Sequence, residues 1–294
     1  MQTQIIPLRS HTYTDAQLLA NQVGEEVTIA GVLRLVHSQN NPVVVLLHGS
    51  GGYREFIDHW VLLLNQHHFS TLVIDSFTGR GLTDVGANQQ SLGRLASIAD
   101  AYAALAYLKM HPQVDSQHIF LQGFSRGGQG ALYAAMQRFA KRWGYHNDGF
   151  KAVASFYPNC CFEYLSDTEV INSPIRIFHG MADDYNPIDA SIKYVERAKA
   201  NGADIELFQY PDSHHGFDGK SLPTLSLLPN AQSTRNCRII ETQPGVLINK
   251  ATGQPFTYQD PQIETGVHVG YNAKAATKAQ QQLLDFFKQI RDKS

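Results

Sequence analysis

Cysteine is scarce in this 294-residue sequence, which contains only Cys160, Cys161 and Cys237. Three cysteines are too few for the disulfide framework that stabilises many small secreted proteins. Either all three thiols are reduced, or one of the adjacent pair bonds to Cys237 and one thiol stays free. A hydrophobic core must therefore stabilise the fold, and an apolar content of 43% is enough to fill one.

A large excess of charge of either sign is also missing. The 24 Lys and Arg and the 26 Asp and Glu give a formal net charge of −2, which does not favour nucleic acid or an anionic membrane as a partner. No run approaches the roughly 18 apolar residues of a membrane-spanning helix, and the first residues lack the pattern of an export signal. We expect a soluble protein, cytoplasmic, or periplasmic or secreted if a leader was removed. The oligomeric state stays open.

Patterns typical of metal sites are absent as well. The thirteen histidines are scattered, and no group of His, Cys and Asp has the spacing of metal ligands. The sequence therefore predicts no metal site.

Short apolar runs alternate with helical periods along most of the chain. Residues 43–47 are apolar throughout, as in a strand that is buried on both faces of a parallel sheet. Similar runs occur at residues 71–74, 118–122, 152–156, 175–178 and 205–208. Helical periods cover residues 56–67, 92–110, 126–141, 188–200 and 273–291. This alternation predicts an α/β fold, with a mostly parallel sheet, helices on both faces and a single domain over residues 1–294.

The start of the chain has a different pattern. Apolar residues alternate over residues 26–30 and 32–36, which predicts an opening hairpin that turns near Gly31.

Residues 218–271 have no helical pattern and contain five prolines. Strand-like pieces occur at residues 238–240 and 246–249, and a turn at residues 250–253 would join the second piece to residues 256–258. A stretch this long without helix is usually functional or a decoration. We interpret residues 218–271 as a lid-like insertion near the mouth of the active site.

Ser125 is the best candidate for a nucleophile. It is the central residue of the pattern Gly-Phe-Ser-Arg-Gly at residues 123–127, between an apolar run and a helical period. Such a strand–turn–helix context is what a nucleophile elbow requires, with glycines where the backbone is too tight for side chains.

An activated serine needs a base, and the base needs an acid that orients it. Asp183 follows the predicted strand at residues 175–178, where a carboxylate would face a ligand in an open α/β sheet; Asp184 is the competing candidate. His215 follows the last core strand and is favoured over the neighbouring His214 as the base. The order Ser, Asp, His is that of α/β-hydrolases.

The developing oxyanion needs two N–H donors. We expect one from the backbone of Arg126, and the other from Ser50 or Gly51 in the glycine-rich turn after residues 43–47. This turn could instead bind phosphate, but it lacks both the Rossmann glycine spacing and a P-loop lysine. His48 is interpreted as structural.

Together these segments resemble the dienelactone hydrolase-like branch of the α/β-hydrolase superfamily. The resemblance covers residues 25–217 and the final helix, and it rests on the segments His48-Gly49-Ser50-Gly51-Gly52, Gly123-Phe124-Ser125-Arg126-Gly127, Gly180-Met181-Ala182-Asp183, Tyr210-Pro211 and His215-Gly216-Phe217. It implies an eight-stranded sheet, a Ser125–His215–Asp183 triad, and hydrolysis of small-molecule esters or lactones without a metal or organic cofactor. Serine stands where the name-giving members have cysteine, which favours general esterase-like chemistry.

Several side chains near the ends of the predicted strands are candidates for the substrate pocket: Tyr53, Phe77, Arg80, Phe124, Tyr157 and Tyr185. Arg80 would pair either with a substrate carboxylate or with a loop carbonyl or aspartate. If the guanidinium groups of Arg80 and Arg126 both faced the pocket, they would favour an acidic ester.

The sequence thus predicts a serine hydrolase that forms an acyl-enzyme. A peptidase of the prolyl-oligopeptidase type has the same triad order but usually carries a large propeller domain, and only about 25 residues precede the first predicted strand here. An acyltransferase would differ only in the acceptor of the acyl group. A non-catalytic binding protein would have little reason to contain all three triad residue types in order.

Overall fold

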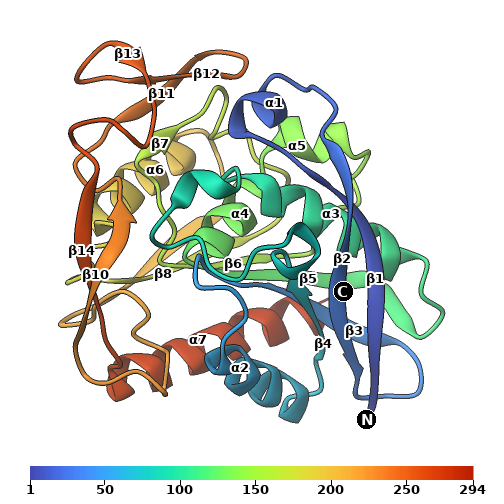
Figure 1. Ribbon diagram of the computed structural model, residues 1–294. Helices are drawn as coiled ribbons and strands as arrows, with labels where there is room; N and C mark the ends of the chain where they lie inside the picture. The colour runs from blue at the N-terminus through green and yellow to red at the C-terminus, as the bar shows by residue number, and fades with distance from the viewer. Residues whose placement is uncertain (294) are drawn as a thin grey trace.

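An eight-stranded sheet forms the centre of the computed structural model, which describes residues 1–293 (Figure 1). The strand order is β1-β2-β4-β3-β5-β6-β8-β9, and all neighbours from β4 to β9 are parallel. The strands are β1 (Gln2–Thr12), β2 (Glu25–Leu35), β3 (Asn41–Leu47), β4 (Ser70–Asp75), β5 (Val114–Phe124), β6 (Val153–Phe156), β8 (Ile175–Gly180) and β9 (Ile205–Tyr210). The predicted α/β class, the parallel strands and the implied eight-stranded sheet are confirmed.

Helices cover both faces of this sheet (Figure 1). Helices α2 (Glu55–Gln66) and α7 (Ala273–Arg291) pack on one face. The other face carries α1 (Asp15–Leu19), α3 (Ala96–Lys109), α4 (Arg126–Ala134), α5 (Gln137–Arg142) and α6 (Ile188–Ala200). The helix predicted over residues 126–141 is broken between α4 and α5, where Met136 forms a β-bridge with Val170. Among residues 1–293, none of the helices is long and apolar enough to cross a membrane.

Strand β3 shows why the central strands are rich in apolar residues. Val43, Val45 and Leu47 belong to the core on one face of the sheet. Val44 and Leu46 alternate with them and belong to the core on the other face. Because side chains alternate along a strand, a strand that is covered on both faces has no position that tolerates a polar residue at low cost.

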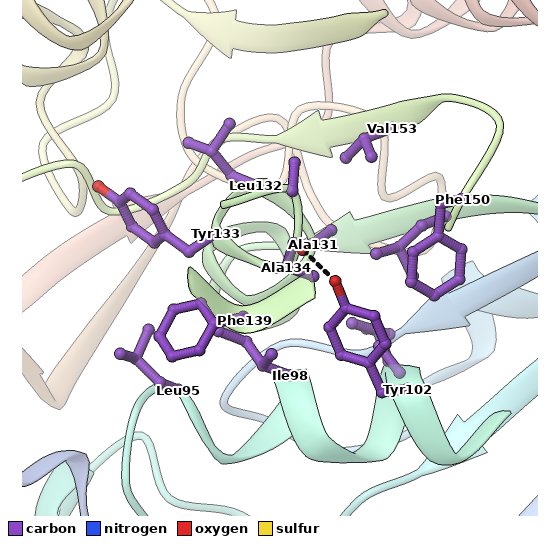
Figure 2. Close-up of a cluster of buried hydrophobic side chains, with 14 of the residues drawn as sticks. Leu95, Ile98, Tyr102, Ala131, Leu132, Tyr133, Ala134, Phe139, Phe150 and Val153 are labelled. Atoms are coloured by element: carbon purple, nitrogen blue, oxygen red, sulfur yellow. Dashed lines mark hydrogen bonds between the residues drawn. The ribbon is translucent and has the colours of Figure 1, made fainter. Parts of the chain in front are cut away.

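The core between α3 and α4 is closed by a buried tyrosine (Figure 2). The Tyr102 hydroxyl donates a hydrogen bond of 2.6 Å to the carbonyl oxygen of Ala134. Ala134 is the last residue of α4, and carbonyls at a helix end have no partner within the helix. Tyr102 therefore both fills the core and satisfies a buried polar group.

The predicted opening hairpin is wrong. β2 runs without a turn through Gly31, and its antiparallel partner is β1, in which Ile6 lies opposite Gly31. A side chain at Gly31 would come within 2.9 Å of Leu72. This glycine allows close packing in the middle of a strand and does not mark a turn. The expectation that the first strand begins near residue 25 is wrong as well, because β1 precedes it.

The segment at residues 218–271 forms two small β-structures at one side of the molecule (Figure 1). One is an antiparallel ribbon of β10 (Ser226–Ser233) and β14 (Glu264–Val269), which the sequence analysis did not predict. The other contains β7 (Phe162–Glu163), β11 (Ile239–Gln243), β12 (Val246–Asn249) and β13 (Gln254–Pro255). The predicted strands at residues 238–240 and 246–249 lie in or next to β11 and β12. The third predicted piece is displaced toward β13.

Candidate active site

Ser125 lies at the sharp turn between β5 and α4. Its backbone has φ 55° and ψ −114°, a conformation that non-glycine residues rarely adopt. A side chain at Gly123 would lie 2.0 Å from the carbonyl oxygen of Gly127, and one at Gly127 would lie 2.4 Å from that of Leu47. Both glycines are required because the turn packs tightly against its own helix and against β3. This packing holds Ser125 in the strained conformation.

His215 and Asp183 complete a chain of hydrogen bonds with Ser125. The Ser125 hydroxyl is 2.8 Å from His215 Nε2, and His215 Nδ1 is 2.8 Å from Asp183 Oδ2. A carboxylate only accepts hydrogen bonds, so Nδ1 carries a hydrogen and Nε2 is left to accept a hydrogen bond from the Ser125 hydroxyl. The three side chains follow β5, β8 and β9, whose carboxyl ends lie at one edge of the sheet.

Asp183 is buried and has an unusually full set of partners. Its Oδ1 accepts the backbone N–H groups of Tyr185 at 2.9 Å and Asn186 at 2.8 Å. Its Oδ2 also lies 3.4 Å from Nε2 of His179, a buried histidine. Burial acts to raise the pKa of Asp183, but attraction to His215 and hydrogen bonds from His179 and His215 outweigh it and hold the pKa well below its usual value. The carboxyl group therefore stays ionised.

Asp184 and His214, the competing candidates, make no side-chain hydrogen bond to Ser125 or His215. Asp184 accepts hydrogen bonds from the backbone N–H and from Nδ1 of His268 in β14, at 2.9 and 2.8 Å. The ring of His214 lies 6.2 Å from that of His268. Both side chains lie against His268 of the β10–β14 ribbon.

Three backbone N–H groups close to Ser125 in the sequence or in the cavity wall have no acceptor in the described part of the chain. Arg126 is the first residue of α4, so its N–H has no acceptor within the helix. Within residues 1–293 the N–H groups of Ser50 and Gly51 also have no acceptor, whereas that of Gly52 donates to Gly49. These are the positions from which two donors could converge on an oxyanion.

His48 fixes this glycine-rich turn. Its Nδ1 lies 2.8 Å from the carbonyl oxygen of Gly49, and its Nε2 accepts the N–H of Ser76 at 3.1 Å. Burial lowers the pKa of His48, so the ring is neutral and keeps both contacts. The structure therefore gives His48 a structural place next to the site.

A cavity of about 340 Å³ adjoins Ser125 and His215. Phe124, Tyr157 and Tyr185 line it, and the rings of both tyrosines pack on His215 with centroids 4.6 and 4.7 Å away. The β10–β14 ribbon supplies one side of the cavity, which is lined there by Leu228, Pro229, Asn230, Ala231 and Val269.

The other three predicted pocket residues lie elsewhere. Arg80 forms a bidentate ion pair with the buried Asp100, at 2.8 and 2.9 Å. Of the partners considered for Arg80, the structure therefore shows an aspartate of the protein itself. Phe77 is buried against the ring of His48. The Tyr53 hydroxyl donates a hydrogen bond to the Asp58 carboxylate, and Tyr53 does not line the cavity.

Arg126 does not line the cavity either, although its Nε lies 3.4 Å from the hydroxyl of Ser50 in the cavity wall. It donates to the carbonyl oxygens of Leu92, Gly93 and Gln89, and to the side chain of Gln89 at 2.6 Å. Burial next to Arg94 lowers the pKa of this guanidinium to about 10. The premise of the acidic-ester hypothesis, two arginine side chains facing the pocket, is therefore wrong.

Two polar residues near the site were missed by the sequence analysis. Asp218 is buried and accepts hydrogen bonds from the Trp60 indole at 2.7 Å and the Tyr157 hydroxyl at 2.8 Å. Gln89 donates to the Tyr185 hydroxyl at 3.0 Å. Each thus fixes one of the tyrosines that pack on His215. Their partners are distant in sequence, so no local pattern pointed to them.

All three cysteines are buried free thiols. Burial raises the pKa of Cys160 to about 12 and that of Cys237 to about 11. The alternative with three reduced thiols is the one observed.

A mostly parallel sheet with a serine at the tight turn after its central strand defines an α/β-hydrolase fold. Residues 29–291 match the dienelactone hydrolase family, and the chain belongs to that family. It is therefore a member of a hydrolase family. No curated protein matches the sequence.

Solved structures share this fold at low sequence identity. A putative dienelactone hydrolase from Klebsiella pneumoniae is 16% identical, with 97% of this chain and 99% of that chain covered and a TM-score of 0.60. A dienelactone hydrolase-like promiscuous phosphotriesterase from metagenomic libraries is 18% identical, with 99% of each chain covered and a TM-score of 0.61. A dienelactone hydrolase from Anabaena variabilis is 22% identical, with 73% of this chain and 89% of that chain covered and a TM-score of 0.52.

Proposed function

We propose that this protein is a serine hydrolase that cleaves carboxylic esters or lactones through an acyl-enzyme on Ser125. The observation that carries the proposal is the hydrogen-bonded chain from Ser125 through His215 to Asp183, with 2.8 Å at each step. The chain lies beside a cavity large enough for a small ester.

In the first half of the reaction, Ser125 Oγ attacks the acyl carbon and its proton passes to His215 Nε2. Asp183 holds Nδ1–H and stabilises the imidazolium that forms. The N–H of Arg126, with that of Ser50 or Gly51, receives the negative charge on the carbonyl oxygen. His215 then gives its proton to the leaving alkoxide, and the acyl group stays on Ser125.

In the second half, water takes the place of the alcohol. His215 accepts a proton from the water as the water attacks the acyl carbon, and the same N–H groups stabilise the second oxyanion. When the intermediate collapses, the proton returns to Ser125 Oγ and the carboxylic acid leaves.

The test is to treat the protein with a fluorophosphonate probe and to locate the adduct by peptide mass spectrometry, beside a Ser125→Ala variant. We expect a single adduct on Ser125 in the wild type and none in the variant. Hydrolysis of 4-nitrophenyl hexanoate should be lost in the same variant. A folded wild-type protein that neither reacts with the probe nor hydrolyses the ester would contradict the proposal.

A further inference from the structure

We infer that the active-site cavity accepts esters whose acyl group is uncharged and apolar, and that it discriminates against acyl groups that carry a carboxylate. This inference rests on the proposed function and adds the substrate class. It reverses the acidic-ester hypothesis, since the positions of the charged side chains in three dimensions differ from those that the sequence suggested.

The charged groups around the cavity are the first reason. Among the described residues that line it, Asp84 is the only Asp, Glu, Lys or Arg. The guanidinium groups of Arg80 and Arg126 are both engaged elsewhere, with Asp100 and with the Gln89 region. A carboxylate bound in the cavity would therefore find no cationic side chain among the lining residues.

Asp84 is placed firmly beside the oxyanion turn. The N–H of the next residue, Val85, donates to the carbonyl oxygen of Ser50 at 2.8 Å. Asp84 Oδ1 accepts the N–H of Gly86 at 2.7 Å. A side-chain carbon placed on Gly51 would lie 3.6 Å from Asp84 Oδ2 and 3.4 Å from Arg54 Nε, so the ion pair of these two residues adjoins the turn. The negative charge is thus held next to the turn that would receive the substrate carbonyl.

Arg54 balances this charge only in part. Its guanidinium lies 3.3 Å from Asp84 Oδ2, and the two side chains are 61% and 46% exposed. Ion pairs this exposed are weak because water and salt screen them. Arg54 itself does not line the cavity.

The remaining lining is mostly apolar. Phe56 and Phe124 lie among it, and the ribbon adds Leu228, Pro229 and Ala231. A carboxylate moved from water into such surroundings loses its hydration without gaining a partner, which is costly. An alkyl chain in the same place gains from burial.

The experiment compares two esters that differ in one charge. 4-Nitrophenyl hydrogen adipate carries a free carboxylate, and methyl 4-nitrophenyl adipate has the same chain with the charge removed. We expect kcat/KM for the neutral ester to exceed that for the anionic ester by at least about tenfold at low salt. Added salt should narrow the difference, since it screens Asp84.

Matched variants test the origin of the difference. The quantity compared is kcat/KM for the neutral ester divided by kcat/KM for the anionic ester. Asp84→Asn should lower this ratio at least about threefold by raising kcat/KM for the anionic ester. Arg54→Gln should raise the ratio because it leaves Asp84 unpaired. Glu55→Gln, an exposed acid outside the cavity, should leave the ratio unchanged.

Equal rates on both esters, or a preference for the anionic one, would overturn the inference and leave the proposed function intact. Hydrolysis of neither ester through Ser125 would overturn the proposed function, and the inference with it.

Discussion

At the scale of single residues, Asp183 and Asp218 are two buried carboxyl groups with different surroundings. Asp183 accepts two backbone N–H groups and lies against two histidines. Asp218 accepts one indole N–H and one hydroxyl, with no cation in contact. The first is therefore held as an anion, whereas burial raises the pKa of the second.

Replacing Asp183 by Asn should lower kcat by roughly 10³- to 10⁴-fold. An amide no longer selects the tautomer of His215 that accepts the serine proton, and it does not stabilise the imidazolium. Steady-state hydrolysis of 4-nitrophenyl hexanoate measures the loss, and thermal unfolding checks that the variant is folded. Asp184→Asn is the control, since its carboxyl group does not touch His215; a comparable loss of kcat there would contradict the assignment.

Replacing Asp218 by Asn should change how stability depends on pH. Because the folded protein binds the Asp218 proton more tightly than the unfolded chain, the free energy of unfolding of the wild type falls as pH rises from the unfolded toward the folded pKa. Compared with Asp218→Asn, the free energy of unfolding of the wild type should fall by about 1.4 kcal/mol for each unit by which the pKa of Asp218 in the folded protein exceeds that in the unfolded chain. Urea unfolding between about pH 4 and about pH 7 measures it; a constant difference between the two proteins would contradict the prediction.

At the scale of elements, β10 brings the inserted segment to the site. Its pairing with β14 is irregular between Leu228 and Gln232. The residues from Leu228 to Ala231, at this irregularity, line the cavity. Bulges of this kind often re-aim side chains next to active sites. An element that the sequence pattern did not reveal thus shapes the space for substrate.

Replacing Ala231 by Leu should shift the preference toward shorter acyl groups. Ala231 is buried against Tyr185 and Val267, so a larger side chain must take up part of the cavity. We expect the ratio of kcat/KM for 4-nitrophenyl hexanoate over the acetate to fall at least about tenfold. Leu227→Ala in the same strand is the control, because Leu227 is exposed and outside the cavity. An unchanged ratio in a folded Ala231→Leu protein would show that β10 does not limit the acyl group.

At the scale of the whole molecule, the ribbon is tied to the α/β sheet through the loop that carries Asp183. Asp184 accepts two hydrogen bonds from His268. It also lies 3.7 Å from the guanidinium of Arg235, which forms an ion pair with Glu264. The Ser233 hydroxyl donates to the carbonyl oxygen of Tyr185 in the same loop. The loop therefore joins the sheet to one wall of the cavity.

Replacing Asp184 by Ala should loosen this attachment without disrupting the hydrogen bonds of Ser125. We expect faster trypsin cleavage at Arg235 and Arg238, a Tm lower by a few degrees, and KM raised about three- to tenfold with kcat nearly unchanged. Asp285→Ala, on the exposed face of α7, is the control. Unaltered cleavage and KM would show that Asp184 is not needed to hold the ribbon.

Local pattern was enough to predict several parts of this protein. The apolar runs that became β3, β4, β5, β6, β8 and β9 could be recognised because strands covered on both faces favour apolar residues. Gly123 and Gly127 around Ser125 could be recognised because the tight turn excludes side chains. Asp183 and His215 could be proposed from their places after strands, since the carboxyl ends of parallel strands share one edge.

Tertiary structure alone decided the rest. β1 pairs with the whole of β2, and β10 pairs with β14 across some thirty intervening residues. Arg80 forms an ion pair with Asp100. These contacts join positions that are far apart in the sequence, and the local sequence at each position shows no sign of its partner. The sequence could therefore indicate the chemistry of the site, whereas the shape and charge of its cavity depend on long-range packing.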